Sequence, residues 1–150
     1  MNTIDEAVDF AIEKEGEMAA YYTQLAGIAE TFGSREKFDE LAKMEMHHKD
    51  LLEELDMKKV PEEIEHSTPD LKISDYLKDI KFSPDIRYQD VLIMAMKAEE
   101  QSHRSYLSLA ANFPKDSDIF HLFDFLAEQE AKHKYMIESE YEDNVLREDH

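Results

Sequence analysis

The chain has 150 residues and a formal net charge of −19 at pH 7, from 36 acidic and 17 basic side chains. This length suits one domain. The negative charge disfavours binding to nucleic acid, because it would repel the phosphate backbone. The 150 residues contain no cysteine, which excludes thiolate zinc sites, iron–sulfur clusters and cysteine nucleophiles within them.

Four long periodic segments predict an all-α, antiparallel four-helix bundle, in a single domain over residues 1–150. The segments span about residues 4–30, 35–57, 85–112 and 117–141, and the scarcity of glycine (3) and proline (4) favours such long helices. The first turn is expected near Gly33 and Ser34, with the serine as N-cap of the second helix. Short connections predict two antiparallel hairpins. A long crossover over residues 58–84, with a short helix near 74–80, would join them.

No segment approaches the roughly 20 apolar residues of a membrane span. The first residues are acidic where a signal peptide would be basic and then apolar. We therefore expect a soluble cytoplasmic protein with neither a membrane nor a nucleic acid as partner.

The two expected hairpins repeat one sequence pattern. Residues 11–26 and 95–110 share A-x3-E-x6-Y-x2-L-A, and residues 38–48 and 123–133 share F-D-x-L-A-x2-E-x2-H. An internal repeat of this kind predicts two similar structural units. Two such hairpins would be related by an approximate twofold axis, on which the repeated residues can converge.

Helical phase places the repeated polar residues in the apolar seam of each helix. At one level, each seam is interrupted by a glutamate alone, or by a glutamate and a histidine one turn apart. The six residues are Glu15, Glu45, His48, Glu99, Glu130 and His133. Four buried carboxylates would be costly and would repel one another. Two divalent cations would neutralise them and the imidazoles would complete the coordination; a buried polar layer without metal is the alternative.

This order of ligands resembles the rubrerythrin-like di-iron branch of the ferritin-like superfamily, and the resemblance covers nearly the whole chain. It implies two iron ions as cofactor, with Glu45 and Glu130 as bridging ligands; manganese or a mixed pair would suit the same residues. The remaining roles that it implies are terminal carboxylate ligands at Glu15 and Glu99, one imidazole ligand per metal at His48 and His133, and hydrogen bonds to the carboxylates from Tyr22 and Tyr106.

The chain also departs from the family pattern. Rubrerythrins carry a rubredoxin domain with a four-cysteine iron site, which this cysteine-free sequence lacks. Their third helix has an additional glutamate one turn after its first ligand, where this chain has Ser102 and His103. Glu100 and His103 form a rival Glu-x-x-His on this third helix and are alternative ligands. Glu99 is preferred because the repeat aligns it with Glu15.

Three functions are compatible with such a site. The favoured one is a redox enzyme of the peroxidase or oxidase type, whose partners are hydrogen peroxide or dioxygen and an external electron donor such as a rubredoxin or a reductase. The second is the oxidation, binding or storage of ferrous iron, and the third is a metal-stabilised bundle that binds another protein. No catalytic residue separate from the metal site is expected. A homodimer is expected because related proteins pair.

Overall fold

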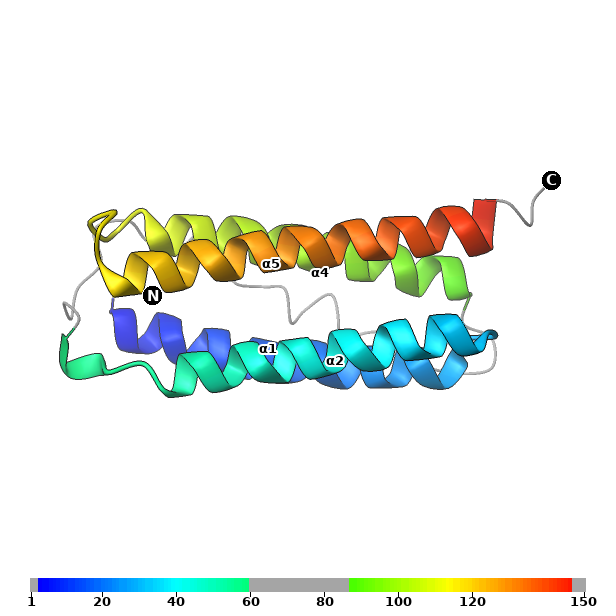
Figure 1. The fold of residues 1–150 in the computed structure, drawn as a ribbon, viewed down its shortest axis with the longest axis horizontal. Coiled ribbons are helices and arrows are strands. Elements are labelled where there is room, and N and C mark those ends of the chain that lie inside the picture. Colours follow the sequence, from blue (N-terminus) through cyan, green and yellow to red (C-terminus); the bar gives the residue numbers. More distant parts are fainter. Residues whose placement is uncertain (1–2, 60–86, 147–150) are drawn as a thin grey trace.

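The computed structural model describes residues 3–59 and 87–146 and confirms the all-α four-helix bundle (Figure 1). Helices α1 (Ile4–Ile28) and α2 (Phe32–Glu53) form one antiparallel hairpin, and α4 (Tyr88–Ala110) and α5 (Asp118–Tyr141) form the other. A 3-10 turn, η1 (Met57–Lys59), follows α2, and a π-helical turn, η2 (Glu142–Leu146), extends α5. None of the described helices has the length and apolar character of a membrane span.

The two hairpins lie side by side with α2 next to α5 (Figure 1). Helix α2 ends and α4 begins at opposite ends of the bundle, as a crossover between them requires. The expected crossover over residues 58–84 lies outside the described residues, apart from its first two residues in η1. The short helix expected near residues 74–80 also lies outside them.

Helix α2 begins three residues earlier than expected because Thr31 is its N-cap. The Oγ1 atom of Thr31 accepts a hydrogen bond from the backbone N–H of Ser34 at 3.1 Å, and the helix starts at Phe32. The expected turn at Gly33 and Ser34 is therefore wrong, since both residues lie in the first turn of α2. The Ser34 hydroxyl instead donates to the carboxylate of Glu140 on α5 at 2.7 Å.

Two apolar clusters fill the bundle, one on each side of a polar level at its middle. The first cluster includes Met18, Tyr22, Phe38, Leu92 and Ile137. The second includes Val8, Leu52, Leu109, Phe123 and Leu126. Each cluster takes side chains from all four helices, so tight packing on both sides fixes the rotation of every helix at the level between them.

Candidate metal centre

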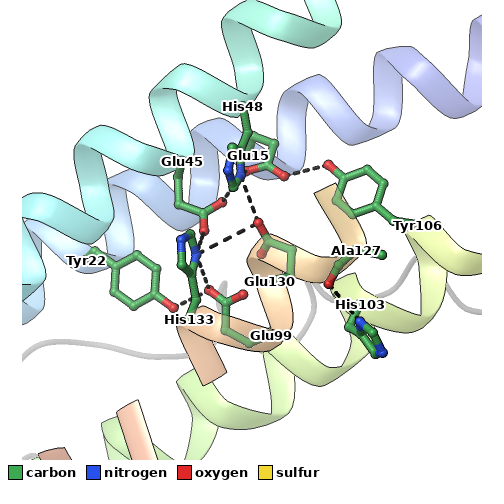
Figure 2. A network of polar contacts seen from close by, with 10 residues as sticks. All are labelled: Glu15, Tyr22, Glu45, His48, Glu99, His103, Tyr106, Ala127, Glu130 and His133. Carbon is green, nitrogen blue, oxygen red and sulfur yellow. Dashed lines mark hydrogen bonds and ion pairs between the residues drawn. The ribbon is translucent and has the colours of Figure 1, made fainter. Parts of the chain in front are cut away.

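Six side chains that the repeat singled out meet at this middle level (Figure 2). All six are at most 2% exposed. They are Glu15 on α1, Glu45 and His48 on α2, Glu99 on α4, and Glu130 and His133 on α5. Packed helices rather than loops therefore position every member of this cluster.

The potential ligand atoms of the cluster form two overlapping groups, and within each group all atoms lie within 4.8 Å of one another. One group is Glu15, Glu45, His48 and Glu130, and the other is Glu45, Glu99, Glu130 and His133. Each group thus has three carboxylates and one imidazole. Glu45 and Glu130 belong to both, which is the placement that a bridging carboxylate requires.

His48 faces three of the carboxylates through its Nδ1 atom. That atom lies 2.9 Å from Glu130 Oε1, 3.6 Å from Glu15 Oε2 and 3.8 Å from Glu45 Oε2. Burial disfavours the imidazolium, but the hydrogen bond to Glu130 and the nearby carboxylate of Glu15 outweigh it and raise the pKa of His48 to about 9. In the metal-free protein His48 is therefore protonated at neutral pH and donates to Glu130.

His133 occupies the related position in the second hairpin, and its pKa shifts in the opposite direction. Its Nδ1 atom lies 2.6 Å from Glu45 Oε1, 3.7 Å from Glu99 Oε1 and 3.9 Å from Glu130 Oε1. Although its closest contact is shorter than that of His48, burial lowers the pKa of His133. Burial and then repulsion by Glu130 raise the pKa of Glu45 well above its ordinary value. Both shifts favour the uncharged form of the group concerned.

Two tyrosine hydroxyls connect the hairpins at this level (Figure 2). Tyr22 on α1 donates to Glu99 on α4, and Tyr106 on α4 donates to Glu15 on α1 at 2.5 Å. Burial and the neighbouring carboxylates raise the pKa of both phenols, so each keeps its proton and stays a donor. Each phenol thereby fixes the orientation of a carboxylate on the opposite hairpin.

Glu100 and His103, the alternative ligands on α4, lie outside the cluster. Glu100 pairs with Arg104 at 2.9 Å and with Lys134 at 3.2 Å, and both contacts are on the outside of the bundle. His103 Nδ1 lies 2.7 Å from the backbone carbonyl of Ala127 and points away from the centre (Figure 2). One residue turns a helix by about 100°, so a helix that directs Glu99 inward carries Glu100 to its flank.

The donor atoms of the cluster fit a metal. Each of the four carboxylates has a buried Oε2 atom that receives no hydrogen bond within the described part of the chain. Burial also raises the pKa of Glu99 to about 7, even though Tyr22 donates to it. Unpaired buried carboxylate oxygens are costly, and coordination to cations would remove that cost. Hard oxygen donors with imidazole suit iron or manganese, so the cluster fits a di-iron carboxylate site.

Lys14 is a buried basic residue near this cluster that sequence reasoning missed. It is only 6% exposed, and burial lowers its pKa to about 8 although Glu130 and Glu15 favour its charged form. The repeat aligns Lys14 with Ala98. A charged residue at a position where the other copy of the repeat has alanine was the available sequence signal. Its ammonium group offsets part of the negative charge of the carboxylates.

Comparison with protein families matches the chain to rubrerythrin over residues 6–141. No curated protein and no solved structure gives a match. The matched range includes all six residues of the cluster and both tyrosines that donate to it.

Proposed function

The chain belongs to the rubrerythrin family, and from this we propose that it is a di-iron oxidoreductase that reduces hydrogen peroxide or dioxygen. The observation that supports this most directly is that Glu45 and Glu130 belong to both ligand groups. Reduction of an O–O bond takes electrons in pairs, and two iron ions held at shared carboxylates would supply one electron each. A metal with a purely structural role needs only a single closed site.

The ligand roles follow from membership of the two groups. Glu45 and Glu130 would bridge the two ions. Glu15 and His48 would complete the coordination of one ion, and Glu99 and His133 that of the other.

The surrounding chain would hold these ligands in place during the reaction. Tyr22 and Tyr106 each leave one oxygen of their carboxylate partner free for a metal while fixing the other by a hydrogen bond. The apolar clusters on both sides keep bulk water away, which strengthens every electrostatic interaction at this level.

Metal binding would release protons from the cluster. Burial and repulsion by neighbouring carboxylates of the cluster raise the pKa of Glu45 and that of Glu130 well above the ordinary value, and that of Glu99 to about 7. A carboxylate must lose its proton to coordinate a metal fully. The affinity for metal is therefore expected to rise with pH.

Electrons would come from outside these 150 residues. The 150 residues contain no cysteine, so they hold no four-cysteine iron site. We propose an external donor, such as a rubredoxin or a reductase. The homodimer and the cytoplasmic location stay predictions, and a size measurement in solution tests the first of them.

Reaction of the iron-loaded, reduced protein with hydrogen peroxide tests this function. We expect two irons per chain and, in a stopped-flow experiment, rapid oxidation by peroxide that a chemical reductant reverses over repeated cycles. Loading of many irons per chain in a large shell would instead indicate iron storage. Binding of about two irons without reaction with either oxidant would refute the redox function, and binding of less than about one iron would refute the metal centre.

A further inference from the structure

A surface cavity of about 230 Å³ lies between α2 and α5 and reaches the cluster. His48 forms part of its wall, although this residue is only 2% exposed. Phe125 stands beside it, 41% exposed, with its ring edge-on to the imidazole at a centroid distance of 6.4 Å. Two other surface cavities, one between α1 and α2 and one between α4 and α5, are lined by no cluster residue.

This cavity lies across the approximate twofold axis of the bundle. The repeat aligns Met44 with Gln129, and it aligns Glu40 with Phe125. All four residues line the cavity. A cavity lined by both members of two related pairs must straddle the axis that relates them. The same axis relates the two carboxylates that both ligand groups share.

We propose that this cavity is the portal through which a divalent cation reaches the shared carboxylates. The inference rests on the metal centre of the proposed function. The net charge of −19 favours cations around the molecule, and Glu40 places an exposed carboxylate at the cavity. Within the described residues Glu40 has no ion-pair partner. A cation that passes Glu40 next meets the imidazole of His48, whose Nδ1 atom faces the carboxylates.

Three side chains of the cavity oppose passage, and one is His48, whose imidazole is protonated before a metal binds. The other two are Lys43, which places a positive charge in the lining, and Phe125, whose ring stands edge-on beside His48. The Lys43 charge distinguishes a cation from a neutral molecule as the species that passes, because it would repel and slow only a cation. The Phe125 ring would slow both.

The steric part of the proposal is tested by Phe125→Trp in the metal-free full chain. Stopped-flow absorbance would follow Co²⁺ uptake, and mixing of the loaded protein with excess chelator would follow its release. The larger ring is expected to slow uptake and release by the same factor and to leave the Co²⁺ affinity unchanged, because it alters the path and not the end states. Leu107→Trp is the matched control, since Leu107 is 43% exposed and lies on α4, away from the cavity.

The electrostatic part is tested by Glu40→Gln and Lys43→Gln. Glu40→Gln should slow Co²⁺ uptake and Lys43→Gln should accelerate it, each by about two- to sixfold at low ionic strength, and added salt should shrink both effects. Glu13→Gln and Lys97→Gln make the same changes of charge on exposed positions of α1 and α4, and they should leave the rate unchanged.

Unchanged uptake and release in Phe125→Trp would overturn the portal. A slower Phe125→Trp variant with no response to either charge change would overturn the assignment to a cation. A wild-type protein that binds no Co²⁺ would refute the metal centre itself, whereas full Co²⁺ binding with unchanged rates in the variants would refute only the portal. Circular dichroism and full Co²⁺ stoichiometry would establish that each variant is folded.

Discussion

Replacement of Glu45 by glutamine tests whether the two metal positions share a ligand. Glu45 belongs to both ligand groups, whereas Glu15 belongs to only one. Glu45→Gln therefore replaces a charged carboxylate of both groups by a neutral amide, and Glu15→Gln makes this change in a single group. We expect iron to fall from about two ions per chain to less than one in Glu45→Gln, and to about one in Glu15→Gln.

The size of the effect follows from the charges at this level. Four carboxylates balance two divalent cations, and Glu45→Gln leaves the loaded site with an uncompensated positive charge in a buried position. A pair of unit charges 4 Å apart at an effective dielectric constant of about 20 attracts by about 4 kcal/mol. That energy corresponds to close to a thousandfold in binding, so each ion is expected to bind at least that much more weakly.

The assay is anaerobic reconstitution of the metal-free protein with ferrous iron, followed by desalting and elemental analysis against protein concentration. Glu100→Gln provides the control, because Glu100 lies on α4 next to a cluster residue but pairs outside the bundle with Arg104 and Lys134. This variant should retain about two ions. Two ions retained in Glu45→Gln, or equal losses in Glu45→Gln and Glu15→Gln, would refute the overlap of the two groups.

Three further outcomes are expected. Because the folded-state pKa of Glu99 is raised to about 7, its contribution to the stability of the metal-free protein is full below about pH 4.5 and is lost as the pH rises through 7. Urea unfolding should show a loss of about 3 kcal/mol from this group between pH 5 and pH 8, and Glu99→Gln should remove that part of the difference. Tyr22→Phe should weaken iron binding by about 10- to 100-fold in competition with a chelator, whereas Tyr135→Phe, at a 70% exposed position, should not change it. Leu126→Ala should lower the free energy of unfolding by about 2–5 kcal/mol without changing iron stoichiometry, since Leu126 is fully buried in an apolar cluster.

Each of these outcomes has a clear contrary result. A metal-free stability that is constant or rises between pH 5 and pH 8 would contradict the buried ionisation of Glu99. Equal iron affinity in Tyr22→Phe and the wild-type protein would show that the hydroxyl does not orient its carboxylate. Loss of iron in Leu126→Ala at a temperature where the variant is folded would show that packing and coordination are not separable at this level.

The arrangement of the cluster could be anticipated from the sequence because helical periodicity is regular over long segments. A charged residue in an apolar seam has to point inward, and the internal repeat selected Glu99 rather than Glu100 by aligning it with Glu15. Both arguments depend only on spacing along a helix, which the three-dimensional packing then preserves.

Features that depend on choices between chemically equivalent groups could not be anticipated. Thr31 and Ser34 offer similar capping hydroxyls three residues apart, and only the structure shows that Thr31 caps the helix while Ser34 binds Glu140. The contact of His103 with the Ala127 carbonyl also depends on how α4 and α5 are placed next to each other. Neither distinction is visible in periodicity.

The two ligand groups also suggest how such a chain could arise. Each group draws three residues from one hairpin and a single glutamate from the other, either Glu130 or Glu45. A peptide of one hairpin that paired with an identical copy would therefore assemble both groups. Each group would be completed by a glutamate that the other copy supplies across the interface. Duplication and fusion of such an ancestor would conserve this exchange, in which each hairpin supplies one glutamate to the ligand group of the other. Positions that the repeat aligns would then be free to diverge. Glu40 and Phe125, aligned by the repeat but chemically unlike, are an example of that divergence.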